Sequence, residues 1–380
     1  MNVVTKSQSR PRNVAQRHDH IVLVLQGGGA LGAYQAGAYE GLAEMGVVPD
    51  WIAGVSIGAI NAALIAGNPP ERRVERLREF WNRVSSMVPF VPPVSTGPFR
   101  STLNQVSSAA AATFGVPGFF TPRLPAAFFG RTDGDSTASV YQTDALRKTL
   151  EELVDFSLIN KGPGRLSLGA VNVTQGNSVY FDNREMPISV DHVRASGALP
   201  PGFPSVKIDN AYYWDGGLVS NTPLWYVLDN SPQMNALIIQ VDLFDAQGEL
   251  PETLDQVMER DKDIRYSSKT RFNTKRVKEL AELRCALSRL LAKLPPELAE
   301  DADAKHLSEA AKAGQITVAH LINRRLKYST QLKDVEFSRT TVTELWSAGL
   351  EDVRRAATKT DWAEPDVDLL EGIRIYDLTK

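Results

Sequence analysis

The feature that most constrains the fold is a short apolar run, IVLVL, that leads directly into the glycine-rich turn QGGGALG. A buried strand that turns through glycines into a helix is typical of a βα unit, and such units build parallel sheets with helices on their faces. A helix is expected over about 30–45, a second strand over 50–53 and a second helix over 57–66. The opening of the chain therefore predicts an α/β fold.

Strand and helix patterns alternate to about residue 250. The further elements expected are an amphipathic helix over 71–84, a helix over 144–153, a hairpin around Gln175-Gly176-Asn177 and a buried strand over 235–244. After 250, leucines at three- and four-residue steps and a Thr341-x-x-Glu344 capping box indicate helices alone. The whole predicts a three-layer α/β/α sandwich with a mainly parallel central sheet and a helical C-terminal extension.

This pattern divides the chain into three parts. Residues 1–17 are polar and basic and are expected to form a disordered arm, 18–250 form the α/β domain, and 251–380 form the extension. Within the domain, 85–134 is rich in Pro, Gly and Phe around an alanine-rich piece, too broken for a long helix and too apolar for a solvated linker. It is expected to be an insertion that packs over the site or touches an apolar ligand.

Composition limits the partners and the compartment. A net charge of −3 over 380 residues gives no global attraction to nucleic acid, so no nucleic-acid partner is expected and any membrane contact must be local. The apolar run near the N-terminus is shorter than the ~7–15 residues of a signal peptide, and no run approaches the ~20 needed to span a bilayer. We therefore expect a cytoplasmic protein. Its single cysteine, Cys285, excludes an intrachain disulfide.

The turn Gly27-Gly28-Gly29-Ala30-Leu31-Gly32 allows two interpretations. It fits the dinucleotide pattern GxGxxG, which needs an acidic residue at the end of the second strand, about 20 residues on. Asp50 is near that distance but stands at the start of the strand, which argues against a dinucleotide. The alternative is an anion nest, in which glycine N–H groups at a helix N-terminus converge on one point and can hold a tetrahedral oxyanion.

Two further motifs follow along the chain. Gly54-x-Ser56-x-Gly58 is the pattern of a serine nucleophile on a sharp strand-to-helix turn, although a serine helix cap between two glycines would look the same. Asp215-Gly216-Gly217 comes after the proline-studded loop ASGALPPGFP, residues 195–204. Taken alone, an Asp-Gly pair is typical of a tight turn.

In this order the motifs resemble those of bacterial patatin-like phospholipases, over about residues 20–245. The resemblance implies that Ser56 is the nucleophile and Asp215 its general base, in a dyad without histidine. It also implies that the oxyanion hole is formed by Gly27, Gly28 and Gly29. The residues expected to support these motifs are Gly32, Gly54, Gly58, Gly216 and Gly217. The chain departs from many relatives at Leu31, where they carry Arg or Lys, and this weakens the case for phosphate-bearing head groups.

The implied reaction is cleavage of carboxylic ester bonds of lipids through an acyl-enzyme, with no metal and no cofactor. A carboxylate with a pKa near 4 becomes a useful base if it is partly desolvated and held within about 2.6–3.2 Å of the serine oxygen. His192 is the alternative base, because the other histidines precede the first strand or lie in the extension. Two other functions stay open: hydrolysis of non-phospholipid esters, such as short-chain or storage polyester substrates, and non-catalytic lipid binding or scaffolding.

The extension resembles a domain of unknown function appended to some bacterial patatins. We expect it to cover the site or to mediate self-association into a homo-oligomer. Within it, 260–278 holds eight Lys and Arg against two Asp, with Tyr266 and Phe272 interleaved. This segment is either a solvated helix face or a local patch for an anionic membrane surface or a protein partner.

Overall fold

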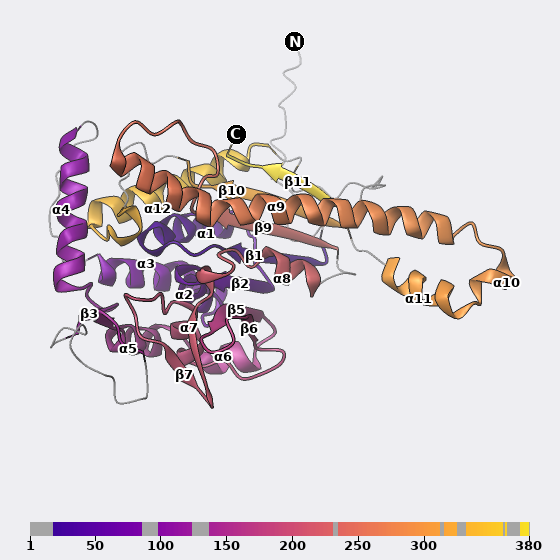
Figure 1. The fold of residues 1–380 in the computed structure, drawn as a ribbon, viewed down its shortest axis with the longest axis horizontal. Helices are drawn as coiled ribbons and strands as arrows, with labels where there is room; N and C mark the ends of the chain where they lie inside the picture. Colours follow the sequence, from indigo (N-terminus) through magenta and orange to yellow (C-terminus); the bar gives the residue numbers. More distant parts are fainter. Residues whose placement is uncertain are drawn as a thin grey trace, which may run out of the picture.

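The structure, a computed structural model, describes residues 18–85, 98–123, 137–230, 235–311, 315–324, 332–359, 362 and 373–379; the side chains of 98–102, 268–278 and 281 are outside this description. Within these residues, the centre is a nine-stranded sheet in the order β11-β10-β9-β1-β2-β5-β8-β7, with β6 beside β5 (Figure 1). Its strands are β1 His20–Leu25, β2 Trp51–Val55, β5 Arg165–Asn172, β6 Ser178–Asp182, β7 Val206–Ile208, β8 Ala211–Asp215, β9 Ala236–Asp242, β10 Ile316–Ile322 and β11 Ile373–Asp377. A separate two-stranded sheet pairs β3 Thr121–Pro122 with β4 Tyr141–Gln142.

Helices surround this sheet. The longer ones are α1 Gly32–Glu44, α2 Ile57–Ala66, α3 Arg73–Val84, α4 Pro98–Phe114, α5 Asp144–Leu153, α9 Leu254–Leu291, α11 Ala302–Ala311 and α12 Arg339–Ala356. The shorter ones are α6 Phe156–Lys161, α7 Val190–Ser196, α8 Leu224–Asp229 and α10 Pro296–Ala299, with 3-10 turns η2 Gly29–Leu31, η3 Pro70–Arg72, η5 Gly216–Leu218 and η6 Lys333–Val335.

The central strands are buried on both faces. β1 runs parallel to β2 on one side and to β9 on the other. Because successive side chains of a strand point to opposite faces, Leu23 and Leu25 pack with the core that includes α1, α2 and α12, whereas Val22 and Val24 pack with α8. Helices thus cover both faces of the sheet, which confirms the predicted three-layer α/β/α fold.

The C-terminal extension is not purely helical. β10 pairs in parallel with β9, and β11 pairs in parallel with β10, so two strands from this region continue the central sheet. The expectation of helices alone was wrong here, because each strand forms by adding to the edge of a sheet whose other strands lie far away in the sequence. The extension therefore shares its sheet with the rest of the protein.

Helix α12 is joined to α1 by close backbone contact. A Cβ on Gly37 would lie 1.9 Å from the Trp346 carbonyl oxygen, and a Cβ on Gly349 would lie 2.1 Å from the Tyr34 carbonyl oxygen. The Tyr34 hydroxyl donates to Asp352 at 2.8 Å across the same contact. This crossing fixes the extension to the first helix of the fold.

Two local expectations need correction. The helix predicted to open at the Thr341–Glu344 capping box begins instead at Arg339, because Ser338 is the N-cap and its side chain accepts from the Thr341 N–H. The region 85–134, expected to be too broken for a long helix, contains the 17-residue α4 over its alanine-rich piece. The predicted arm, 1–17, lies outside the described residues, as do parts of 85–134.

Helix α9 runs along the body and projects well beyond it, carrying α10 and α11 near its far end (Figure 1). Among the described residues, no helix has the length and apolar character needed to cross a bilayer.

Candidate active site

Ser56 lies at the sharp turn between β2 and α2. Its backbone has φ 57° and ψ −123°, a conformation that residues with a side chain rarely adopt. The flanking glycines permit close contacts, because a Cβ on Gly54 would lie 2.3 Å from the Gly58 carbonyl oxygen, and a Cβ on Gly58 would lie 2.3 Å from the Leu25 carbonyl oxygen. The GxSxG spacing therefore reflects a strained turn with close backbone packing, which a simple helix cap does not need.

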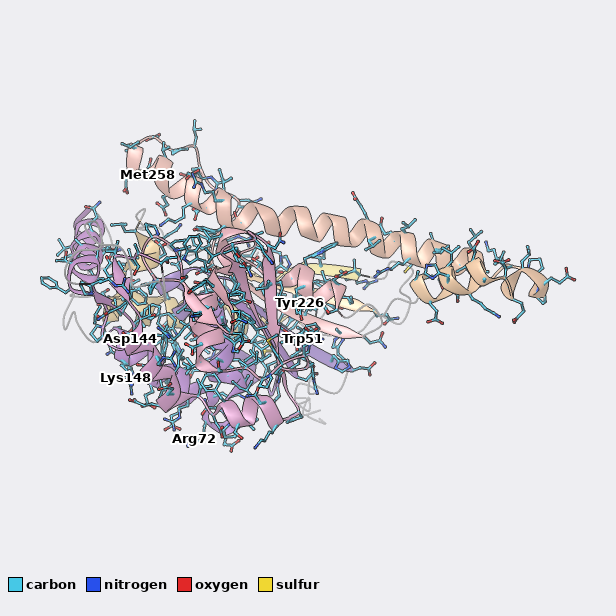
Figure 2. All side chains as sticks on the ribbon, turned by 60° about the horizontal axis from the view of Figure 1, so that its bottom comes forward. Trp51, Arg72, Asp144, Lys148, Tyr226 and Met258 are labelled. Atoms are coloured by element: carbon cyan, nitrogen blue, oxygen red, sulfur yellow. The ribbon has the colours of Figure 1, made fainter. Side chains whose placement is uncertain are left out.

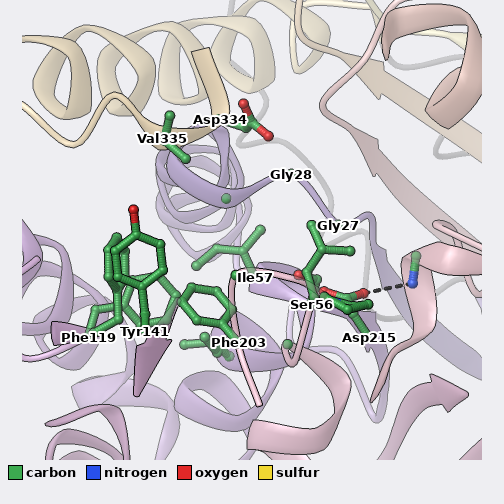
Figure 3. A pocket seen from close by; sticks show the side chains of 18 of the residues that line it. Gly27, Gly28, Ser56, Ile57, Phe119, Tyr141, Phe203, Asp215, Asp334 and Val335 are labelled. Atoms are coloured by element: carbon green, nitrogen blue, oxygen red, sulfur yellow. Dashed lines mark hydrogen bonds between the residues drawn. The ribbon is translucent and has the colours of Figure 1, made fainter. Parts of the chain in front are cut away.

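Asp215 meets Ser56 through the register of three strands. β2 ends at Val55, which pairs with Gly169 of β5, and the next residue of β5, Ala170, pairs with Asp215 of the antiparallel strand β8. Asp215 therefore stands where β2 would continue, beside the residue that follows Val55. Figure 3 shows the Ser56 side chain next to the Asp215 carboxylate at the wall of one cavity, and this contact lowers the pKa of Asp215.

Burial makes the Asp215 carboxylate a stronger base than one in water. The residue is 2% exposed. Burial raises the pKa of Asp215 to about 6, against the lowering effect of the nearby Ser56 side chain and of the hydrogen bond from the Gly217 N–H. The Gly217 bond is 2.7 Å long and is drawn dashed in Figure 3. At neutral pH the group is still mostly ionised and can accept a proton.

The glycine turn forms the wall of the cavity next to Ser56. The N–H of Gly27 donates to the Asn221 carbonyl at 3.0 Å, and the Asn221 side-chain amide donates back to the Gly27 carbonyl at 3.0 Å. The Gly27 amide is thus already engaged, which corrects the expectation that it serves as an oxyanion donor. Within the described part of the chain, the amides of Gly28 and Gly29 have no backbone acceptor, and both residues line the cavity.

The other predicted supporting residues lie around this centre. Gly32 opens α1 against the Ile57 side chain, and a Cβ on Gly216 would lie 2.6 Å from the Gly169 carbonyl oxygen. Leu31 is fully buried in the core and is not one of the residues that line the cavity. Its apolar character therefore leaves the charge of the cavity surface unchanged.

One supporting side chain was missed by the sequence reasoning. Ser196, the last residue of α7, accepts a hydrogen bond from the Ser56 N–H at 3.0 Å and donates to the Gly169 carbonyl at 2.6 Å. It joins the serine turn to the strand beside Asp215. Ser196 belongs to the proline-studded segment 195–204, but nothing in that sequence indicates that its side chain holds another residue in place.

A cavity of about 260 Å³ opens beside Ser56 and Asp215, and most of its walls are apolar. In Figure 3 the dyad candidates lie to one side, and the rings of Phe119, Tyr141 and Phe203 lie to the other. The aromatic lining residues are Phe119, Phe120, Tyr141, Phe203, Phe244, Tyr266 and Phe337. A cavity of this kind suits an apolar chain whose reacting end meets a few polar groups.

Segments far apart in the sequence complete this cavity. Ala112 of α4 and Phe119 come from the described part of 85–134, whereas Val335 and Phe337 come from the extension. The described part of 85–134 and a short piece of the extension therefore both line this cavity.

Ion pairs fasten the 3-10 turn η6 of the extension to α9. Lys333 Nζ lies 3.1 Å from Glu259 and 2.7 Å from Asp263, and Lys262 Nζ lies 2.7 Å from Asp334. The Lys333 side chain is only 10% exposed, so salt screens its pairs less than it screens surface pairs. These contacts hold η6 against the cavity.

His192 has a structural role at the start of α7. Its Nδ1 accepts a hydrogen bond from the Ser189 N–H at 2.9 Å, and its ring meets the Phe181 ring edge-on at 4.6 Å between centroids. Burial lowers the pKa of His192. The residue does not line the cavity, so the structure does not bring this alternative base to Ser56.

The basic segment 260–278 lies on α9. Each of its described cations bonds to a carboxylate or a carbonyl of this chain: Arg260, Lys262 and Arg265. The side chains of 268–278 are outside the described residues. The described cations of this segment therefore make contacts within the chain.

Comparisons with known proteins agree with the motifs. A family model for patatin-like phospholipases matches residues 23–228, and a second one, described as patatin phospholipase, matches residues 264–368. Over 61 residues the chain is 44% identical to a patatin-like phospholipase domain-containing protein of Caenorhabditis elegans, a match that spans 16% of this chain and 6% of that protein. The solved structure of VipD from Legionella pneumophila aligns with a TM-score of 0.32 and 14% identity, covering 96% of this chain and 76% of VipD. Because the first family match takes in more than half of the sequence, the chain belongs to the patatin-like phospholipase family.

Proposed function

We propose that this protein is a serine acyl hydrolase that cleaves carboxylic ester bonds of lipids, with Ser56 as nucleophile and Asp215 as general base. The observation that carries the proposal is the position of a serine on a strained turn beside a buried carboxylate, at the wall of an aromatic-lined cavity (Figure 3). Family membership supports a lipid ester as the substrate class.

The first half of the reaction forms an acyl-enzyme. Asp215 takes the proton of the Ser56 hydroxyl as Oγ attacks the ester carbonyl carbon, and the carbonyl electron pair moves to its oxygen. When this tetrahedral intermediate collapses, the C–O bond to the leaving alcohol breaks. The alcohol oxygen takes the proton from Asp215, and the acyl group stays on Ser56. Water then repeats the sequence, with Asp215 again as base, and releases the acid.

The oxyanion is received by backbone amides. The N–H groups of Gly28 and Gly29 supply donors from the glycine turn, and the Ile57 N–H, at the start of α2, adds a third from the residue after the nucleophile. The partial positive charge at the N-terminus of α2 favours the same negative charge.

The apolar lining of the cavity favours an acyl chain as the part of the substrate that it binds. Aromatic and aliphatic side chains surround most of its volume of about 260 Å³, and burying a chain against them removes apolar surface from water. Self-association through the C-terminal helices, contact with an anionic membrane and a cytoplasmic location stay predictions.

Labelling with a fluorophosphonate tests the proposal and separates it from a scaffold. The reagent phosphonylates an activated serine with loss of fluoride. We expect intact-protein and peptide mass spectrometry to find one adduct, on Ser56. Ser56→Ala should abolish labelling and ester hydrolysis together. Ser220→Ala is the matched control, because Ser220 lies in the loop after Asp215 without lining the cavity. A folded wild-type protein that stays unlabelled would identify a binding protein.

A further inference from the structure

Three amide side chains are buried between the glycine turn and the helix that follows Ser56. They belong to Gln26, to Gln35 of α1 and to Asn61 of α2, and each of the three residues is at most 1% exposed. Side chains crowd the body of the protein, whereas those of the projecting part of α9 stand apart (Figure 2). An amide enclosed in such a body costs free energy unless both its oxygen and its nitrogen have hydrogen-bond partners.

The three residues hydrogen-bond in one chain, which begins at an indole. The Trp81 Nε1–H donates to Asn61 Oδ1 at 3.1 Å, and Asn61 Nδ2 donates to Gln35 Oε1 at 2.9 Å. Gln35 Nε2 in turn donates to the Gln26 carbonyl at 2.7 Å. Asn61 Nδ2 also donates to the Gly32 carbonyl at 3.0 Å. We call this chain, from Trp81 through Asn61 and Gln35 to the Gln26 carbonyl, the amide relay.

The amide relay can take only one orientation. An indole N–H can only donate and a backbone carbonyl can only accept, and these two groups stand at its ends. If the side chain of Asn61 or Gln35 were turned over, two donors or two acceptors would face each other. Apolar side chains of the same shape would fill this space at little cost in stability, whereas hydrogen bonds also fix the geometry. The relay therefore specifies where its two ends lie.

The side chain of Gln26 makes bonds of its own to two further loops. Its Nε2 donates to the Thr222 hydroxyl at 2.9 Å, and its Oε1 accepts from the N–H groups of Leu243 and Phe244 at 2.6 Å and 3.1 Å. Thr222 belongs to the loop that follows Asp215, and Phe244 lines the apolar cavity. Gln26 thus ties the start of the glycine turn to the loop after Asp215 and to the wall of the cavity.

The two ends of the amide relay hold the two sets of backbone amides that we propose as oxyanion donors. Gln26 directly precedes the turn that contains Gly28 and Gly29, and Asn61 lies one helical turn after Ile57, the first residue of α2. Donors must lie about 2.7–3.1 Å from the oxyanion to stabilise it. A shift of the turn against the helix would therefore weaken the oxyanion hole without changing the lining of the acyl cavity.

We propose that Gln26, Gln35 and Asn61 are positioning residues, which hold the glycine turn against α2 so that the oxyanion donors of both converge on one point. The inference rests on the proposed hydrolase function and adds to it residues that no motif contains. None of the three lines the apolar cavity, so they act through the backbone that they hold. Loss of the relay should weaken binding of the transition state and leave binding of the substrate as it is.

The test compares Asn61→Leu, which breaks the amide relay, with the same substitution at Asn68. Asn68 is the matched control because it is a buried amide just beyond the other end of α2. It donates to the Leu64 and Leu153 carbonyls at 2.9 Å and 2.8 Å, outside the relay. Gln35→Met is a second relay variant with a side chain of similar length, and it keeps the test decisive if Asn61→Leu does not fold.

Two measurements separate positioning from folding. Steady-state kinetics on a soluble ester gives kcat and KM, and inhibition by an alkyl trifluoromethyl ketone gives Ki. The Ser56 oxygen adds to the carbonyl carbon of the ketone, its proton passes to Asp215, and the carbonyl oxygen becomes an oxyanion. The Ki of the ketone therefore reports the oxyanion hole, and it does not depend on how much of the protein is folded.

For both relay variants we expect kcat to fall about 10- to 100-fold and Ki to rise by about the same factor, with KM changed less than about twofold. Asn68→Leu should keep the wild-type Ki even where its Tm falls. The double variant Asn61→Leu with Gln35→Met should lose little more than either single variant, because both break one relay.

The outcomes distinguish the two proposals. Wild-type hydrolysis and ketone binding, with an unchanged Ki in the relay variants, would overturn the positioning role and leave the hydrolase proposal standing. An equal rise of Ki in Asn68→Leu would also overturn it, since any buried amide near α2 would then have the same effect. A wild-type protein that neither hydrolyses esters nor binds the ketone would overturn the hydrolase proposal and this inference with it.

Discussion

The apolar cavity and a second, polar cavity have about the same volume of 260 Å³ and are lined by neighbouring residues of the same segments. The apolar cavity is surrounded by aromatic rings and contains the Ser56–Asp215 pair, whereas the polar cavity is lined by charged side chains of both signs: Arg123, Arg147, Arg194, Lys207, Asp144 and Asp191. The difference arises within single segments, because neighbouring residues such as Tyr141 and Gln142 face opposite sides. The chemistry of each cavity is therefore decided by side-chain direction and not by the composition of the segment.

The largest expected effect is the loss of ester hydrolysis when Asp215, in the apolar cavity, is replaced. Asp215→Asn should lower kcat/KM for ester hydrolysis by about 10³-fold or more, because the amide cannot accept the serine proton. Asp242→Asn is the matched control: Asp242 is also buried, burial raises its pKa to about 7, and it lines neither cavity. Steady-state kinetics on a soluble ester provides the measurement. Equal losses in the two variants would mean that Asp215 acts only on the fold.

The same substitution should stabilise the protein at neutral pH. Because the pKa of Asp215 is raised to about 6, the folded state binds this proton more tightly than the unfolded state does. Stability from this group is therefore full below about pH 4 and is lost as pH rises through about 6, a cost of about 3 kcal/mol at pH 7. Asp215→Asn removes that cost. Urea unfolding should show a gain of about 1–3 kcal/mol at pH 7 that disappears at about pH 4. A loss of stability at pH 7 would contradict the assigned burial.

Filling the apolar cavity should lower the activity on long-chain esters more than the activity on short-chain esters. Val335→Trp places a large side chain in the acyl cavity, so we expect kcat/KM for long-chain esters to fall about tenfold while short-chain esters change little. The control is Val257→Trp, the same substitution at an exposed valine of α9. Activity measured over esters of graded chain length gives the comparison. A uniform loss at all lengths would argue against an acyl-binding role for this cavity.

The smallest effect concerns helix α7, which contributes Arg194 to the polar cavity and Ser196 to the serine turn. Ser196→Ala removes the hydrogen bonds to the Ser56 N–H and the Gly169 carbonyl. We expect kcat to fall about tenfold with KM nearly unchanged, because of the two bonds only the one to the Ser56 N–H positions the nucleophile, and its loss costs about 1–2 kcal/mol. Ser196→Thr, which keeps the hydroxyl, should recover part of the rate. An unchanged kcat would show that the turn holds its shape without Ser196.

The motif residues could be predicted because their constraints are local. Gly54 contacts the backbone of Gly58 within the same turn, and the strand before the turn and the helix after it follow from short-range patterns. The pairing of Ser56 with Asp215 came from the resemblance to a family, since nothing local in either segment indicates the other.

The parts that could not be predicted depend on long-range contacts. The Gly27 amide is engaged because Asn221, almost two hundred residues away, supplies the carbonyl. Val335 and Phe337 line the cavity because the extension is held there by the packing of α12 on α1 and by ion pairs between η6 and α9. β10 and β11 become strands by extending an existing sheet edge, which short sequences cannot reveal by themselves.

The most direct test of the Ser56–Asp215 assignment is the pH dependence of fluorophosphonate labelling at Ser56, compared with that of His192→Ala. The account predicts a rate that rises through one ionisation near pH 6, the raised pKa of Asp215, and then levels off, with the same profile in His192→Ala. The comparison is needed because burial also brings the pKa of His192 below its ordinary value. A rate that does not change across this range, or an inflection that disappears in His192→Ala, would contradict the account.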